Sequence, residues 1–123
     1  MTLAGKRILL VEDEAVIAFA VEDMLLDLGC TVVGPAFRLD EARRMAVADE
    51  IDAAILDVNL NDQRSYAVAE ELARRSIPFL FATGYAEGGI DWPQEAELLP
   101  KPYRRDQVQT ALERLLKAAP AEL

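Results

Sequence analysis

Residues 8–11 read Ile-Leu-Leu-Val, and the acidic residues Glu12, Asp13 and Glu14 follow directly. An apolar run this short and unbroken is typical of a strand that is buried on both faces of a parallel sheet. Similar runs recur along the chain, at residues 31–33, 53–56 and 78–82, with a weaker one at 97–99. The sequence therefore predicts five buried strands.

Helix-forming segments separate and follow these runs. Residues 15–28, 39–48 and 66–75 are helical by propensity and pattern, and Ser65 is placed to cap the third of them. The clearest amphipathic face belongs to the last helix, where apolar residues recur at i, i+3, i+4, i+7 and i+8: Val108, Ala111, Leu112, Leu115 and Leu116. The alternation predicts an α/β fold, a doubly wound sheet of five parallel strands with helices on both faces.

Residues 86–96 are the weakest of the predicted helices. Glycines at positions 88 and 89 each disfavour a helix by roughly 1 kcal/mol relative to alanine, and Pro93 disrupts a helix interior. We expect a short or irregular helix here, with Ile90 and Trp92 as its main apolar anchors. Such a segment opens at a low free-energy cost, because it is poorly anchored.

Composition excludes several classes of function. At 123 residues the chain has the size of one domain, and its net charge of −9 argues against nucleic-acid binding. It contains no histidine, which excludes a Ser-His-Asp triad, a His-ligated metal site and a histidine kinase. The single Cys30 cannot form an internal disulfide, and we expect it to be a small buried residue at the start of a strand. The apolar runs are too short to span a membrane, so we expect a cytoplasmic protein.

Polar residues follow four of the predicted strands. Glu12 and Asp13 follow the first strand, Asp57 the third, Thr83 the fourth, and Lys101 comes just after the fifth. Ligands bind at the carboxyl ends of the strands in such sheets, so we expect these residues to share one site. Clustered carboxylates are hard oxygen ligands that suit Mg²⁺, and a carboxylate beside that ion can act as a nucleophile towards a phosphoryl group.

This set of residues resembles that of the receiver domains of two-component response regulators. The matching pieces are the acidic pair Glu12-Asp13, Asp57, Thr83, and Lys101 followed by Pro102. The resemblance covers essentially the whole chain. It implies a flavodoxin-like sheet with strand order 2-1-3-4-5, a receiver domain at residues 1–118, a frayed tail at 119–123 and no output domain.

The resemblance also implies a role for each residue. Asp57 would be phosphorylated by a histidine kinase, while Thr83 and Lys101 would bind the phosphoryl group. The metal site for Mg²⁺ would consist of Asp57, Asp13 as a direct ligand, Glu12 acting mostly through water, and the backbone carbonyl of Asn59. The Lys101-Pro102 peptide bond would be cis. Phosphorylation would then switch the binding of a downstream protein that the sequence does not identify.

The stretch from Pro78 to Tyr85 reads PFLFATGY. It resembles the PFxFATGY signature of a receiver subgroup that is often single-domain and paired with histidine kinases of the HWE and HisKA2 types. One family feature is missing, because Leu98 stands where most receivers carry an aromatic switch residue. Tyr85 is therefore the candidate switch residue, with a plain packing role on the loop as the alternative.

Two other classes of function remain open. The first is a Mg²⁺-dependent phosphohydrolase with an aspartate nucleophile. Such enzymes usually carry a D-x-D motif, whereas residues 57–59 read Asp-Val-Asn. The second is a binding module that works without phosphorylation, which the complete set of site residues argues against. Residues 61–64, Asn-Asp-Gln-Arg, replace the Pro-Gly-rich loop that is common in the family, and we expect a solvated loop there, with a contact to a partner protein as the alternative.

Overall fold

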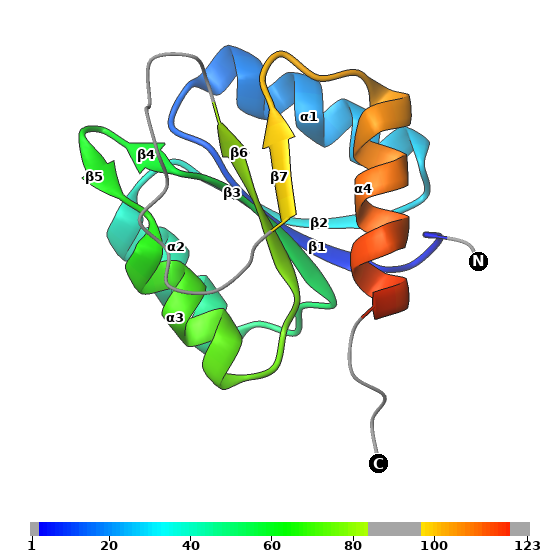
Figure 1. Ribbon diagram of the computed structural model, residues 1–123. Coiled ribbons are helices and arrows are strands. Elements are labelled where there is room, and N and C mark those ends of the chain that lie inside the picture. Colours follow the sequence, from blue (N-terminus) through cyan, green and yellow to red (C-terminus); the bar gives the residue numbers. More distant parts are fainter. Residues whose placement is uncertain (1–2, 84–96, 119–123) are drawn as a thin grey trace.

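Five parallel strands form the central sheet of the computed structural model, which describes residues 3–83 and 97–118 (Figure 1). Their order is β2-β1-β3-β6-β7, which are the second, first, third, fourth and fifth predicted strands, so the predicted order is confirmed. Their bounds are β1 Arg7–Val11, β2 Thr31–Ala36, β3 Ala53–Asp57, β6 Phe79–Thr83 and β7 Glu97–Pro100.

Helices cover both faces of the sheet, as the sequence predicts (Figure 1). The helices within the described residues are α1 Ala15–Asp27, α2 Leu39–Ala48, α3 Tyr66–Arg74 and α4 Arg105–Ala118. The pair α2 and α3 packs on one face and the pair α1 and α4 on the other. None of them has the length and apolar character that a membrane span requires.

The alternation of side chains along the strands divides the core into two layers. In β1, Leu9 and Val11 face α2 and α3, while Ile8 and Leu10 face α1 and α4. All four side chains are at most 1% exposed. Burying a side chain of this size contributes roughly 1.5–3 kcal/mol, so strands that are apolar on both faces stabilise both layers. The polar residues that follow such strands are thereby fixed at one edge of the sheet.

A short β-hairpin follows β3, where the sequence led us to expect a solvated loop. Strand β4, Asn59–Leu60, pairs with β5, Gln63–Arg64, in antiparallel register. The two residues between them, Asn61 and Asp62, have φ angles of 49° and 67°. A two-residue loop with both φ angles positive is a type I′ turn, and Asn and Asp tolerate that conformation better than most residues.

Two expectations about helices need comment. Ser65 lies at the N-cap position of α3, but its side chain makes no capping hydrogen bond. The other is the short or irregular helix expected at residues 86–96, which lies outside the described residues. The candidate switch residue Tyr85 and the tail at residues 119–123 lie outside them as well.

Candidate functional site

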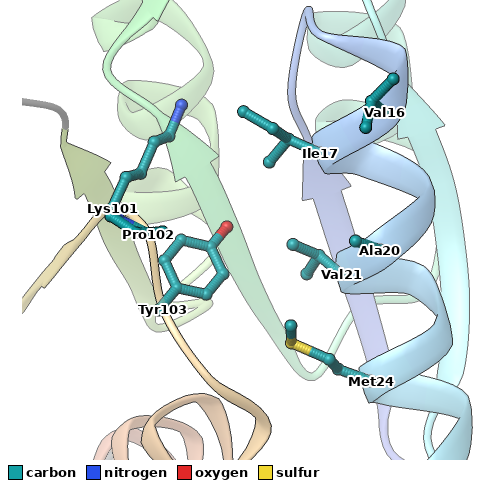
Figure 2. A pocket seen from close by; sticks show the side chains of 8 residues that line it. All are labelled: Val16, Ile17, Ala20, Val21, Met24, Lys101, Pro102 and Tyr103. Atoms are coloured by element: carbon teal, nitrogen blue, oxygen red, sulfur yellow. The ribbon is translucent and has the colours of Figure 1, made fainter.

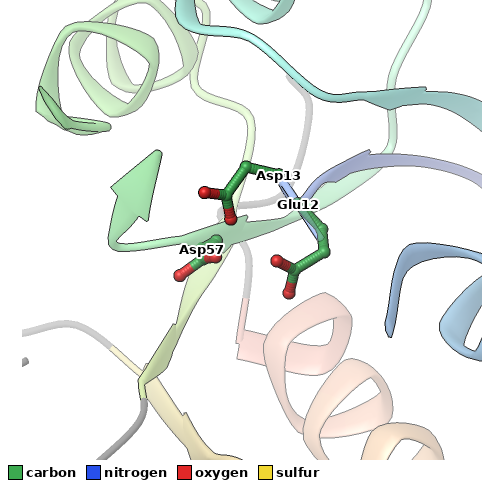
Figure 3. Close-up of side chains that lie close together, drawn as sticks. All are labelled: Glu12, Asp13 and Asp57. Carbon is green, nitrogen blue, oxygen red and sulfur yellow. The ribbon is translucent and has the colours of Figure 1, made fainter. Parts of the chain in front are cut away.

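The ends of β1 and β3 bring three carboxylates together at one edge of the sheet. Glu12 and Asp13 directly follow β1, and Asp57 is the last residue of β3. The two strands are parallel neighbours, so their carboxyl ends lie side by side. Figure 3 shows the three side chains. Each contributes one carboxylate oxygen, and these three oxygens lie within 4.8 Å of one another. Glu12 and Asp57 are 1% and 2% exposed, so the cluster is largely withdrawn from water.

The ammonium group of Lys101 bridges two of these carboxylates. Its Nζ atom lies 2.9 Å from Glu12 Oε1 and 3.0 Å from Asp57 Oδ2. The backbone of Lys101 is fixed as well, because its N–H donates to the Thr83 carbonyl over 2.7 Å. The Lys101-Pro102 peptide bond is cis, as is the Gly34-Pro35 bond. Lys101 is thus held at the carboxyl ends of the strands with its charge directed into the acidic cluster.

The close packing of these charges perturbs their pKa values. Burial, with the nearby Glu12, raises the pKa of Asp57 to about 8, against the opposing effect of Lys101. Burial acts to lower the pKa of Lys101, but its carboxylate partners outweigh this and raise it. Burial likewise acts to raise the pKa of Asp13, yet hydrogen bonds, first among them one from the Asn61 amide, lower it overall. The Asp57 carboxyl therefore binds its proton more tightly than a free aspartate does, because its pKa is raised.

The donor set fits a small hard cation. Three carboxylates face one ammonium group, so the cluster retains excess negative charge when all three are ionised. Carboxylate and carbonyl oxygens are the protein ligands that Mg²⁺ prefers, and this ion needs only a few of them. The Asn59 amide donates to Asp57 Oδ1 over 3.3 Å, which places the Asn59 backbone next to the cluster. The four residues predicted as metal ligands thus lie together.

An apolar groove opens beside Lys101, between α1 and the loop that joins β7 to α4 (Figure 2). Its volume is about 440 Å³. The residues that line it are Val16, Ile17, Ala20, Val21, Met24, Lys101, Pro102 and Tyr103. Tyr103 is 9% exposed, and burial raises its pKa above the usual range. The groove is therefore lined both by α1 and by Lys101, the residue that forms an ion pair with Asp57.

The structure does not bring every predicted site residue into direct contact. Thr83 ends β6 and is half-buried at the same edge of the sheet. Within residues 3–83 and 97–118, the hydrogen bonds and ion pairs of the clustered side chains do not include the Thr83 hydroxyl. Leu98 lies on β7 with half of its surface exposed. Sequence reasoning did not anticipate the Asn61 amide, which donates to Asp13 Oδ2 over 3.0 Å. The signal available for it was the turn-forming pair Asn61-Asp62.

A family model for the response regulator receiver domain matches residues 8–113. Among curated proteins, the phyllosphere-induced regulator PhyR of Methylorubrum extorquens is 32% identical over 115 residues. The matched region covers 89% of this chain and 43% of PhyR, so the chain spans less than half the length of that relative.

Solved structures show the same similarity. SdrG from Sphingomonas melonis Fr1 is 42% identical with a TM-score of 0.81, and the match covers 94% of this chain and 99% of that one. The receiver domain of the sensor histidine kinase PA1611 from Pseudomonas aeruginosa PAO1 is 28% identical with a TM-score of 0.78. That match covers 94% of this chain and 100% of that one, and its structure has a magnesium ion coordinated in the active site cleft.

Proposed function

The chain belongs to the family of response regulator receiver domains, and on this premise we propose that it is a phosphoacceptor in a two-component phosphorelay. Asp57 accepts the phosphoryl group and a histidine kinase supplies it, in the cytoplasm. The observation that carries the proposal is the position of Asp57, buried at the end of β3 among Glu12, Asp13 and Lys101. Residues 1–118 form the receiver unit in this proposal.

The chemistry proposed for Asp57 is a nucleophilic displacement at phosphorus. A carboxylate oxygen of Asp57 forms a bond to the phosphorus atom, and the bond from phosphorus to the donor's imidazole nitrogen breaks. The imidazole leaves with the bonding electron pair. Lys101 is already within 3.0 Å of Asp57, so its ammonium group can pair with a phosphoryl oxygen without a large movement. Thr83, at the end of the neighbouring strand, supplies a hydroxyl for another oxygen.

Mg²⁺ is the proposed cofactor, held by Asp13, Asp57 and the Asn59 carbonyl, with Glu12 acting mostly through water. When bound, it neutralises the negative charge of the incoming phosphoryl group and of the carboxylates. The residues themselves do the positioning. Strand β3 is buried along its whole length and fixes Asp57, and Lys101 offsets part of the charge of Glu12 and Asp57. The magnesium ion coordinated in the active site cleft of the similar PA1611 receiver domain supports this assignment.

Acetyl phosphate with Mg²⁺ tests the proposal and separates it from its alternatives. A phosphoacceptor gains one stable phosphoryl group, visible as a single mass increment, and Asp57→Asn gains none because the amide is not a nucleophile. Rapid release of phosphate over many turnovers would instead identify a phosphohydrolase. A chain that gains no label at all would be a binding module that works without phosphorylation. A label that persists on the Asp57→Asn variant would show that another residue is the acceptor.

The kinase and the switch residue complete the proposal. The PFxFATGY stretch supports a kinase of the HWE or HisKA2 type, and a purified transfer assay with candidate kinases identifies it. We propose Tyr85 as the residue that carries the signal to the unknown downstream protein. Tyr85→Ala is then expected to leave labelling intact and to reduce the difference in partner affinity between the two states, a coupling of about 1–3 kcal/mol. An unchanged difference would remove Tyr85 from the mechanism.

A further inference from the structure

The tip of the β4–β5 hairpin contacts a residue of the acidic cluster directly. The backbone N–H of Asn61 donates to Asp13 Oδ2 over 3.0 Å, across 48 positions of sequence. The Asn61 side chain also approaches the loop after β2, with Nδ2 3.5 Å from the Phe37 carbonyl. One turn residue therefore spans the loops that follow β1 and β2. Its N–H does not take part in the pairing of Leu60 with Gln63, so this donor is available to Asp13.

The hairpin is anchored firmly enough to hold that contact in place. Leu60 is fully buried in the core layer beneath α2 and α3. At the base of the hairpin, the Ser65 N–H donates to the Val58 carbonyl over 2.9 Å. Val58 in turn donates to the Ala82 carbonyl of β6 over 3.2 Å. The turn is thus tied to the central sheet at its base and to the core through Leu60, and the backbone at Asn61 has little freedom to move.

We propose that the turn at Asn61–Asp62 is a positioning device for Mg²⁺ binding, in which the Asn61 amide fixes the orientation of the Asp13 carboxylate. This inference rests on the proposed function, in which Asp13 is a direct ligand of the ion. The amide donates to one carboxylate oxygen, Oδ2, and so restricts rotation of the Asp13 carboxylate, which would hold the ion. Figure 3 shows the Asp13 carboxylate beside that of Asp57, which is the arrangement that the hydrogen bond maintains.

The size of the effect follows from how metal ligands behave. A carboxylate ligand that is held by a hydrogen bond loses less rotational freedom when the ion binds, and removal of such outer partners typically costs about 10–100-fold in metal affinity. Asp13 is only half-buried, so its side chain has room to rotate when the amide is removed. We therefore expect the contact to matter more for Mg²⁺ affinity than for the stability of the fold.

The test removes the N–H of residue 61 and changes little else. Cell-free translation can place glycolic acid at position 61, which turns the amide into an ester, and Asn61→Gly is its matched control. Glycine adopts the positive φ of 49° without strain, so this pair differs at residue 61 only in the N–H group. The ester is expected to bind Mg²⁺ about tenfold more weakly than Asn61→Gly in calorimetric titration. Asn61→Gly itself is expected to stay within about twofold of the unchanged protein.

A second pair controls for the ester itself, which weakens the carbonyl that precedes it. Glycolic acid at position 62, compared with Asp62→Gly, is expected to leave Mg²⁺ affinity unchanged. Thermal unfolding in EDTA should show that all four variants fold. Equal affinities for the ester and Asn61→Gly, or an equal loss in both pairs, would overturn the inference. Failure of the unchanged protein to bind Mg²⁺ or to be labelled would instead overturn the proposed function, and this inference with it.

Discussion

Ser65 carries a fully buried hydroxyl that finds no hydrogen-bond partner within residues 3–83 and 97–118, whereas both polar groups of its backbone are hydrogen-bonded. Its N–H donates to the Val58 carbonyl, and its own carbonyl accepts from Val68 and Ala69 in the first turn of α3. A buried polar atom without a partner costs roughly 1–3 kcal/mol, whereas the backbone bonds do not depend on the side chain. The hydroxyl therefore contributes nothing to capping of α3.

This observation predicts the effect of Ser65→Ala. Capping serines usually stabilise a helix, and their replacement by alanine costs about 1 kcal/mol. Here we expect no loss, and a gain of up to about 1 kcal/mol, because the change removes a buried atom without a partner. Urea unfolding of the two proteins at one pH measures the difference. A loss of 1 kcal/mol or more on substitution would show that the hydroxyl does find a partner.

Helix α1 provides apolar surface beside the site, although the charged site residues lie on other parts of the chain. Val16 is 83% exposed and Phe19 is 53% exposed, so the first turns of the helix present apolar surface to solvent. Phe19 packs edge-on against Phe37, with ring centroids 6.0 Å apart. Val16 also lines the groove that leads to Lys101 (Figure 2). Because this apolar surface is continuous with the proposed phosphoryl site, a protein that delivers the phosphoryl group to Asp57 would contact it.

Val16→Asp tests that role of α1. The residue is exposed and lies in the first turn of the helix, where an acidic side chain is favourable, so the fold should be unaffected. Phosphoryl transfer from the kinase is expected to slow by about tenfold, as when an apolar contact is lost from an interface. Labelling by acetyl phosphate should not change, since this small donor needs no protein surface.

The same substitution on α2 serves as the control. Val47 is 56% exposed on the opposite face of the sheet, and Val47→Asp should leave transfer from the kinase unchanged. If Val47→Asp slows transfer as much as Val16→Asp, the effect is one of charge and not of the α1 surface. If the Val16→Asp variant accepts the phosphoryl group from the kinase at the normal rate, the kinase contacts another face.

The hairpin of β4 and β5 is an element that the sequence did not predict. Strands of two residues are too short for any periodicity, so β4 and β5 left no pattern to detect. The pair Asn61-Asp62 was the available signal, because these residues tolerate the positive φ angles of a type I′ turn. The contact from Asn61 to Asp13 joins residues 48 apart, and only the folded structure brings them together.

At the scale of the whole molecule, the sheet was predictable because each central strand carries its own local signature. The unbroken apolar run at Ile8–Val11 already implies burial on both faces, and the structure buries alternate residues in two layers. The common edge of the carboxylates followed from the parallel arrangement. The relative positions of the charged side chains within the site were not predictable. That Lys101 bridges Glu12 and Asp57 depends on side-chain orientations that no local pattern encodes.

This charge arrangement makes the stability of the metal-free protein depend on pH. The pKa of Asp57 is raised from 3.8 to about 8, so the folded state holds this proton more tightly than the unfolded state does. Its contribution to stability is therefore complete below about pH 4 and is lost as the pH rises through 8. The lowered pKa of Asp13 makes stability depend on pH only below about pH 4. The raised pKa of Lys101 does so only above the usual alkaline range of a lysine. Between pH 5 and 8, Asp57 dominates among these shifted groups.

We expect the free energy of unfolding in EDTA to fall between pH 5 and 8, by at most about 1.4 kcal/mol per pH unit from this group. Asp57→Asn lacks the titrating carboxyl, so its stability should change much less over the same range. Saturating Mg²⁺ should abolish this trend for the unchanged protein, because the ion binds the ionised carboxylates, so that Asp57 is ionised in both the folded and the unfolded state over this range. Denaturant unfolding of both proteins, with EDTA and with Mg²⁺, gives the four pH profiles. Parallel profiles for the two proteins in EDTA would mean that Asp57 is ionised throughout this range, and that Lys101 neutralises the metal-free cluster more completely than the raised pKa implies.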